Sequence, residues 1–231
     1  MNTDYEALEK DLDYKFKDIG LLKLALTHSS YAHEHAKETK GEYNERIEFL
    51  GDAVLELIVS DYLYNNYEKL SEGKMTKTRA SLVCEYTLAS CAREIKLSEY
   101  IRLSKGEDGT GGRYRDSILS DAFESVLGAM YLDGGMTPVA AFVKKILLND
   151  IEHKQLFYDA KTTLQEQVQA HKGDKLEYVL VGEEGPEHNK VFKAEARVNG
   201  EVIGVGEGKT KKSAEQHAAY QALLEMKVVK R

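Results

Sequence analysis

The spacing of the apolar residues changes between residues 150 and 160, and this change constrains the fold more than any other feature of the sequence. Before it, apolar residues recur three and four positions apart, which is typical of helices that bury one face. After it, a helical segment precedes three partly alternating segments with glycine-bearing turns between them, and a helical segment closes the chain. The sequence therefore predicts an all-α domain followed by a small α+β domain of order α-β-β-β-α.

We expect the first domain to span residues 1–153, a polar linker 154–160 and the second domain 161–231. The second domain should have helices at 161–171 and 211–227, with strands in the segments LEYVLVGEEG, KVFKAEARVNG and EVIGVGEGK. Helices of the first domain are expected at 4–12, 19–30, 43–68, 75–94, 115–132 and 138–151.

The composition is that of a folded protein outside membranes. Of the 231 residues, 42% are hydrophobic, which is enough for a core in each of two domains. The opening segment is charged throughout and lacks an apolar signal region, and no stretch approaches the eighteen or so apolar residues of a spanning helix. We therefore expect a cytoplasmic protein that does not contact membranes. Cys84 and Cys91 are seven residues apart in one expected helix, which places them beyond disulfide reach and makes them small apolar residues.

Acidic residues recur one turn apart inside two strongly apolar helical segments. Glu45, Glu48 and Asp52 share one helix face in NERIEFLGDAVLELIVS. Asp121 and Glu124 stand one turn apart in RDSILSDAFESVLGAMYL. Apolar residues occupy most of the remaining circumference, so both helices are expected to be buried, and a buried carboxylate needs a cation or a shifted pKa.

The two helices could bring four carboxylates together. Oxygen ligands suit Mg²⁺, or Mn²⁺ in its place, better than zinc, and phosphodiester hydrolysis is a natural use of such a site because the metal can activate a water. The net charge of −7 fits this interpretation, because all of the excess acid lies before residue 159. Two alternatives compete with a metal site: acids that face solvent, and a di-iron bundle. The di-iron bundle requires Glu-x-x-His pairs, which this sequence lacks.

The segment from Asn44 to Leu55, NERIEFLGDAVL, resembles the signature helix of the ribonuclease III family, with isoleucine at 47 where leucine is more usual. The segment DAFE at 121–124 resembles the second acidic motif of that family, and LTHSSY at 26–31 and SEG at 71–73 also match its pattern. The resemblance covers nearly the whole chain. It implies an all-α catalytic domain followed by a double-stranded-RNA-binding domain.

The resemblance also assigns residues to the site. It implies a metal site formed by Glu48, Asp52, Asp121 and Glu124. Of these four acids, Asp52 and Glu124 would be the more critical for catalysis. Glu45 and Glu72 would be accessory acids near the substrate or the subunit contact, although both could equally be solvated surface acids.

The family resemblance further implies a homodimer formed through the signature helix, with Phe49 as a contact residue unless it packs in the core. The activity implied is Mg²⁺-dependent cutting of double-stranded RNA in the processing of rRNA and mRNA. Each subunit would cut one strand, leaving 5′-phosphate and 3′-hydroxyl ends with a short 3′ overhang. The main alternative is a protein of the same fold that binds duplex RNA without cutting it.

The closing helix begins with a cluster of lysines at its positive end, a place that binds phosphate well. Ser213 and Gln216 fit a capping box there. The whole segment resembles a double-stranded-RNA-binding domain, which reads duplex RNA by shape. That resemblance assigns RNA contacts to Thr162, Gln165, Glu166, Gln169, His188, Lys209, Lys211 and Lys212.

The glycine-rich stretch 106–115 could be a mobile loop that closes on the substrate strand, with Lys105, Arg113 and Arg115 as the basic residues nearby. Ordinary loop chemistry explains its glycines equally well, so both interpretations stay open.

Overall fold

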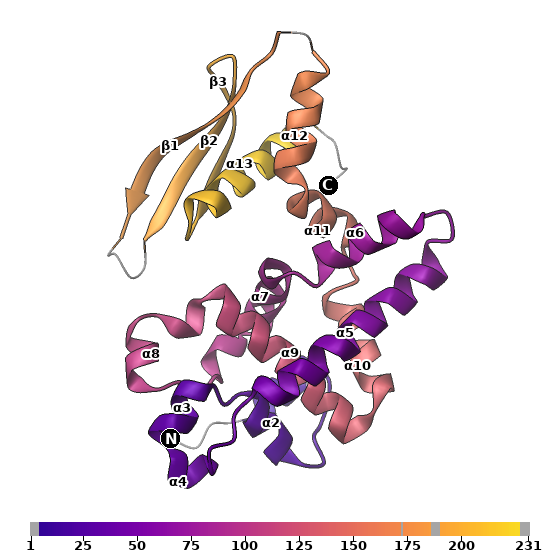
Figure 1. The fold of residues 1–231 in the computed structure, drawn as a ribbon, viewed down its shortest axis with the longest axis vertical. Coiled ribbons are helices and arrows are strands. Elements are labelled where there is room, and N and C mark those ends of the chain that lie inside the picture. The colour runs from indigo at the N-terminus through magenta and orange to yellow at the C-terminus, as the bar shows by residue number, and fades with distance from the viewer. Residues whose placement is uncertain (1–4, 172, 186–189, 227–231) are drawn as a thin grey trace. The chain divides into compact units, whose positions relative to one another are not determined.

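The computed structural model describes residues 5–171, 173–185 and 190–226, and the described chain divides into two compact units after Asn149. The first unit is helical throughout and the second contains the sheet (Figure 1). The fold class predicted from the sequence, an all-α domain followed by a small α-β-β-β-α domain, is confirmed. Among the described residues, none of the helices combines the length and apolar character that crossing a bilayer requires.

The first unit is organised around two long helices, α5 (Glu45–Asn66) and α9 (Asp116–Gly134), which pack against each other. Phe123, Leu55 and Leu127 are completely buried in this unit, as expected for the apolar faces of its central helices. The remaining elements surround the pair: α1 (Tyr5–Leu12), α2 (Ile19–Ala25), α3 (Ser29–Glu34), α4 (Ala36–Thr39), α6 (Glu72–Leu82), α7 (Glu85–Glu94), η1 (Leu97–Glu99), α8 (Lys105–Gly109), η2 (Gly112–Tyr114) and α10 (Met136–Ile146).

Two helices expected from the sequence are each divided in the structure. The expected helix 19–30 stops at Ala25, because Thr27 forms a parallel bridge with Arg102 and the main chain cannot serve both a helix and that bridge. The expected helix 75–94 divides at Cys84, which is extended and precedes α7. There the hydroxyl of Thr87 donates to the carbonyl of Ser81 at 2.8 Å, so side-chain bonds replace part of the helical ladder. Cys84 therefore lies at a helix boundary, half-buried, whereas Cys91 is buried.

The second unit begins earlier than the sequence suggested. Most of the expected linker, 154–160, lies in helix α11 (Ile151–Tyr158), and Ala160 begins α12 (Ala160–Gln169). Helix α11 is fixed within this unit because the amide of Gln216 donates to the carbonyls of Phe157 and Tyr158, at 2.5 and 2.9 Å. His153 also pairs with the hydroxyl of Tyr220 at 2.8 Å. These tertiary hydrogen bonds hold α11 in the second unit, and the local sequence does not show them.

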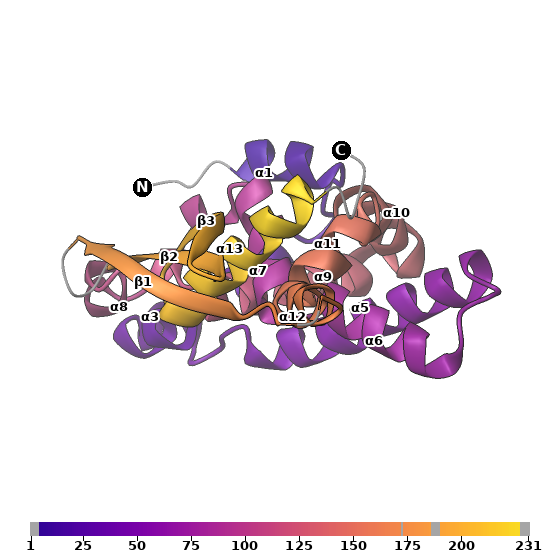
Figure 2. The same cartoon turned by 90° about the horizontal axis from the view of Figure 1, so that it is seen from above.

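The sheet of the second unit is antiparallel, in the order β1 (Leu176–Glu184), β2 (Val191–Val198), β3 (Glu201–Gly208). Helix α13 (Lys211–Glu225) packs against β2 and β3, and α12 packs against α13 (Figures 1 and 2). Small residues make this packing close: a Cβ atom at Gly206 would lie 2.2 Å from the main-chain nitrogen of Ala218. Ala194, paired with Gly206 in the register, is completely buried.

The predicted capping box at Ser213 is wrong. Thr210 is the residue that caps α13, and its side chain accepts a hydrogen bond from the main-chain nitrogen of Ser213 at 3.0 Å. Thr210 is extended, with ψ at 157°, as an N-cap residue requires, whereas Ser213 already lies inside the helix. Both residues are good N-caps, so the local sequence alone did not distinguish them.

Candidate metal centre

The crossing of α5 and α9 places the acidic residues of the two helices together. The helices cross at glycines: a Cβ atom at Gly51 would lie 1.8 Å from the carbonyl oxygen of Glu124, and one at Gly128 would lie 2.3 Å from that of Ile47. Only glycine permits so close an approach of two helix backbones. The contact at Gly51 is with the main chain of an acidic residue itself, so the crossing fixes the separation of the two acid-bearing turns.

Three carboxylates converge at this crossing. Glu48 of α5 and Asp121 and Glu124 of α9 each offer an oxygen atom, and these three atoms lie within 4.8 Å of one another. All three side chains are half-buried. A cluster of oxygen ligands at this spacing has the geometry and the chemistry to hold a divalent cation such as Mg²⁺ or Mn²⁺.

The electrostatics of the cluster also favour a cation. Burial, with the negative charges of Asp52, Glu48 and Asp121, raises the pKa of Glu124 to about 8. Burial likewise raises the pKa of Glu48 to about 7, with Asp121 as the strongest of its charged neighbours. Three half-buried anions repel one another, and a bound divalent cation would neutralise them.

Asp52 is not one of the three converging acids. It is exposed one turn beyond Glu48, although its charge raises the pKa values of both Glu48 and Glu124. The expectation that α5 is buried all round is therefore wrong, since Phe49 is 79% exposed and Leu57 58% exposed. The rest of the first unit leaves these side chains exposed, so apolar character alone did not indicate burial.

The accessory acids lie in different surroundings. Glu45 is exposed at the first turn of α5, near enough to raise the pKa of Glu48. Glu72 begins α6, accepts a hydrogen bond from Thr76 at 2.9 Å, and lines a groove between α5 and α6. That groove is also lined by Leu57, Tyr64 and Met75, so Glu72 borders an exposed apolar surface of α5.

The glycine-rich stretch 106–115 is held in place by ion pairs. The guanidinium of Arg113 binds both carboxylate oxygens of Asp108, at 2.5 and 2.8 Å, and donates to the carbonyl of Ser98 at 2.6 Å. Arg115 forms an ion pair with Glu107. Both arginines therefore have partners within the loop, which favours a structural role for them.

His28 lies within the LTHSSY motif at 26–31, and the sequence alone indicated no role for it. Burial raises the pKa of Asp121, and a hydrogen bond from Ser120 and the charge of His28 oppose that rise. The available signal was the occurrence of His28 in a motif with no other assigned function.

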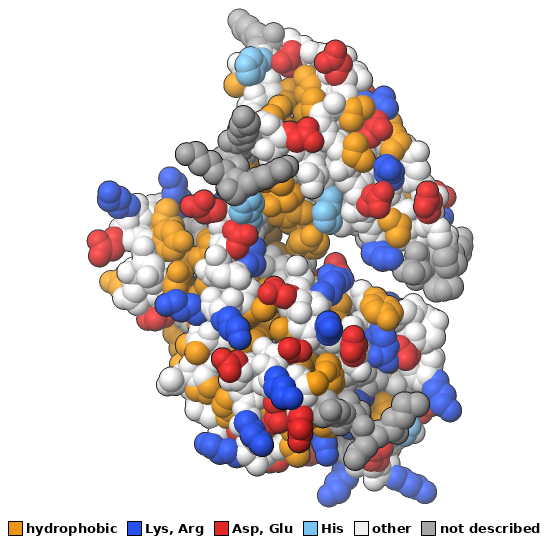
Figure 3. Space-filling model, turned by 180° about the vertical axis from the view of Figure 1, so that it is seen from behind, with side chains coloured by type: hydrophobic (Ala, Val, Ile, Leu, Met, Phe, Trp, Pro, Cys, Tyr) orange, Lys and Arg blue, Asp and Glu red, His pale blue; other side chains and the backbone are white. Residues whose placement is uncertain are grey.

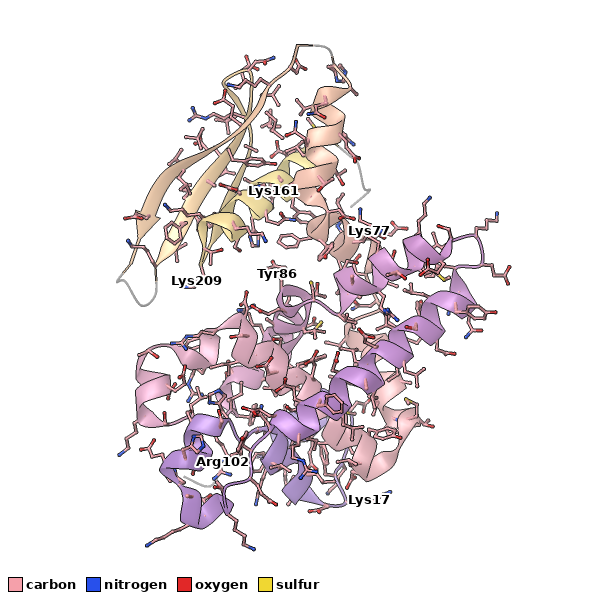
Figure 4. The ribbon with its side chains drawn as sticks, in the orientation of Figure 1. Lys17, Lys77, Tyr86, Arg102, Lys161 and Lys209 are labelled. Carbon is pink, nitrogen blue, oxygen red and sulfur yellow. The ribbon has the colours of Figure 1, made fainter. Side chains whose placement is uncertain are left out.

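The expected RNA-contacting residues are accessible in the second unit. Thr162, Glu166 and Gln169 of α12 are exposed and Gln165 is half-buried, and their spacing places them along one side of the helix. Lys161 at the start of this helix instead points inward: it pairs with Glu215 and lies 4.6 Å from the centre of the Tyr178 ring (Figure 4).

The three lysines assigned to RNA are exposed at the start of α13. Lys209 lies in the turn between β3 and α13 (Figure 4), and Lys211 and Lys212 occupy the first helical positions. His188 lies outside the described residues. On the face of the first unit that Figure 3 presents, acidic and basic side chains are interspersed, so that face has no surface of a single sign for a phosphate backbone.

Comparison with known proteins covers both units. Residues 18–151 match the family model described as Ribonuclease-III-like, and residues 160–226 match the double-stranded RNA binding motif. Ribonuclease 3 of Listeria monocytogenes serotype 4a is 49% identical over 223 residues, which cover 96% of this chain and 97% of the relative. Ribonuclease 3 of Caldanaerobacter subterraneus is 47% identical over 226 residues, covering 96% and 98%.

Two solved structures are similar to the first unit. Both are nuclease domains of ribonuclease III from Campylobacter jejuni. One is 39% identical with a TM-score of 0.59 and covers 66% of this chain and 98% of that chain. The other, described as flexible in a region involved in dimer formation, is 41% identical with a TM-score of 0.58 and covers 62% and 96%.

Proposed function

The chain belongs to the ribonuclease III family, and on that premise we propose that it is an endoribonuclease that hydrolyses phosphodiester bonds in double-stranded RNA. The observation that carries this proposal is the convergence of Glu48, Asp121 and Glu124 within 4.8 Å, on a chain that also matches the double-stranded RNA binding motif. A divalent metal at the three acids fits both the family and the geometry.

We propose Mg²⁺ as the metal, with Mn²⁺ able to replace it, because the site offers carboxylate oxygens. Glu48, Asp121 and Glu124 would hold the cation. When bound, a divalent cation supplies polarisation of the scissile phosphate and activation of a water. Asp52, at the exposed side of the cluster, would face the substrate and hold the attacking water by a hydrogen bond. Asp52 and Glu124 are therefore the proposed catalytic residues.

The proposed reaction uses water, and not the ribose 2′-hydroxyl, as the nucleophile. Attack in line on phosphorus then expels the 3′ oxygen, which takes up a proton and leaves a 3′-hydroxyl and a 5′-phosphate. The proposed substrates are duplex regions of ribosomal and messenger RNA precursors, and the proposed site of action is the cytoplasm. Two subunits that each cut one strand would leave short 3′ overhangs.

We propose that the exposed apolar face of α5 forms a homodimer. Phe49, Leu57 and Tyr64 are 79%, 58% and 72% exposed, which is unusual for large apolar side chains on one helix. The Campylobacter nuclease domain with 41% identity is described as having a region involved in dimer formation. Glu45 and Glu72 lie at the margins of this face and would be accessory acids near the subunit contact.

The second unit would bind the duplex by its shape. Thr162, Gln165, Glu166 and Gln169 are proposed to contact one minor groove and His188 another, with the three lysines at the start of α13 on the intervening phosphates. Such binding depends little on sequence and weakens steeply as salt is added.

The test is cleavage of end-labelled duplex RNA with and without Mg²⁺, by the wild type and by Glu124→Gln. We expect metal-dependent cutting by the wild type to 5′-phosphate and 3′-hydroxyl ends. Glu124→Gln should lose cutting while its RNA binding, measured by gel shift, persists. Binding without cutting by the wild type would instead support a protein that holds duplex RNA.

The dimer is tested separately by sedimentation of the wild type and of Phe49→Ser. A dimeric wild type and a monomeric but folded Phe49→Ser variant are expected. His33→Ser, another exposed position outside α5, is the matched control and should remain dimeric. If Phe49→Ser were dimeric, as His33→Ser is expected to be, Phe49 would not be needed for the subunit contact.

A further inference from the structure

Helix α6 places a guanidinium against α5, on the helix that carries Glu48 and Asp52. The two helices pack against each other (Figure 1), and Nη1 of Arg79 donates to the hydroxyl of Ser60 at 2.9 Å. The same nitrogen lies 4.0 Å from Oε2 of Glu56, so this ion pair is long. The Ser60 hydroxyl is itself fixed, because it donates to the main-chain carbonyl of Glu56 at 2.7 Å. Helix α5 therefore holds the Arg79 side chain by one of its nitrogen atoms.

Most of the hydrogen-bonding capacity of this guanidinium is unused within the protein. Arginine has five N–H donors in a planar fork. Among the residues that the structure describes, Nη1 of Arg79 has a hydrogen-bond partner, whereas Nε and Nη2 have none. The side chain is 35% exposed and lines the groove between α5 and α6. An oriented guanidinium with donors left over suits an oxyanion such as a phosphate, which accepts two parallel N–H bonds.

The guanidinium lies at the end of a row of acids that begins at the metal centre. Glu48, Asp52 and Glu56 follow one another at intervals of four residues on α5. Each acid is therefore about 6 Å further along the helix and about 40° further around it than the one before. Asp52, the exposed member, is proposed to face the substrate, and Arg79 stands beside the next acid. A strand of RNA that passes Asp52 along this row meets Arg79 within about one helical turn.

We propose that Arg79 binds a backbone phosphate of the RNA strand that is being cut, near the phosphate at the metal centre. This inference rests on the proposed function and adds one substrate-binding residue to it. A row of acids repels the phosphates of RNA, and the guanidinium offsets that repulsion where the row ends. Ser60 is a positioning residue, because its hydroxyl orients the guanidinium.

An acid of a second subunit is the other anion that could reach this guanidinium. Leu57 and Tyr64 of the proposed dimer face line the same groove. That face is mainly apolar, whereas an RNA strand carries an anion at every nucleotide, so the phosphate is the better partner. The oligomeric state of the variants distinguishes the two partners.

The test measures kcat/KM of the full chain on duplex RNA, with Mg²⁺, at a series of salt concentrations. The slope of log kcat/KM against log salt concentration reports how many phosphate contacts are made. Arg79→Gln removes the charge and the fork, and Arg79→Lys keeps the charge alone. Lys144→Gln makes the same change of charge at an exposed position of α10 and is the matched control. Sedimentation reports the dimer, and thermal melting reports folding.

We expect Arg79→Gln to lower kcat/KM at low salt about tenfold or more, and to make the slope shallower by about 1. Arg79→Lys should keep the slope of the wild type and recover only part of the rate. Lys144→Gln should match the wild type in both quantities. Ser60→Ala, which removes only the anchoring bond, should lower kcat/KM about fivefold with an unchanged slope.

An Arg79→Gln variant with the slope of the wild type would overturn the inference and leave the proposed function standing. A folded Arg79→Gln variant that sediments as a monomer would also overturn it, because Arg79 would then bind the second subunit. If Arg79→Gln did not fold, full activity of Ser60→Ala and Arg79→Lys would overturn it. If the wild type itself cut no RNA, the proposed function would fail, and this inference with it.

Discussion

Replacing Gly51 by alanine should separate the two acid-bearing helices. The new Cβ atom would stand 1.8 Å from the carbonyl oxygen of Glu124, whereas ordinary van der Waals contact begins at 3.4 Å. The obstructing atom belongs to a helix backbone, so the helices must move apart by about 1.5 Å. Overpacking of this kind costs about 1–3 kcal/mol or more, and the better helix propensity of alanine recovers about 1 kcal/mol.

We therefore expect Gly51→Ala to be less stable by about 2 kcal/mol, which lowers Tm by about 4–8 °C for a chain of this size. Displacement of the carboxylates by more than 1 Å should also reduce cleavage of duplex RNA about 100-fold. Both quantities are measured on the purified full chain, by calorimetry and by single-turnover cleavage.

Gly73→Ala is the control for stability, because a Cβ atom there would have no neighbour within 4 Å. This helical substitution should leave Tm unchanged or raise it. A Gly51→Ala variant with the Tm and cleavage rate of the wild type would show that the two helices do not need this close contact.

Three further outcomes are expected. The pKa values of Glu48 and Glu124 are raised to about 7 and about 8. The folded state therefore binds extra protons at pH values above the usual pKa of glutamate. Without divalent metal, the Tm should fall as the pH rises from about 5 to about 8. Saturating Mg²⁺ should reduce this fall, and a flat metal-free profile would contradict the repulsion. Gln216→Ala, which loses two bonds to α11, should destabilise the second unit by about 1–2 kcal/mol in denaturant titration, with exposed Gln221→Ala as control. Thr210→Ala should destabilise the second unit by about 1 kcal/mol in the same titration, because it removes the N-cap of α13. Equal stability of the variant and the wild type would show that another group caps this helix.

The sequence predicted the elements that depend on local periodicity. The two acid-bearing helices are confirmed near their expected bounds, since α5 is Glu45–Asn66 and α9 is Asp116–Gly134. The spacing of Asp121 and Glu124 was sufficient to place both on one helix face. Their approach to Glu48 could be proposed from the two apolar runs, but the close crossing at Gly51 depends on a partner helix more than seventy residues away in the sequence.

The features that the sequence did not predict depend on tertiary bonds or on another molecule. Helix α11 is fixed by Gln216, about sixty residues further along the chain. The break before α7 follows from the Thr87 and Ser81 bond, which competes with the helical ladder. Asp52 is exposed because it lies on the uncovered face of α5. The apolar residues of that face look in the sequence like those of a buried helix, and only the structure of the whole unit shows that they are exposed.

We propose above that the acids at the crossing of α5 and α9 bind the divalent metal used for cutting RNA. The most direct measurement is the anomalous scattering of Mn²⁺ in crystals of the full chain. We expect a peak within ligand distance, about 2.2 Å, of oxygen atoms from Glu48, Asp121 and Glu124. A peak only elsewhere, or no peak in crystals grown at a Mn²⁺ concentration that supports cleavage, would contradict it.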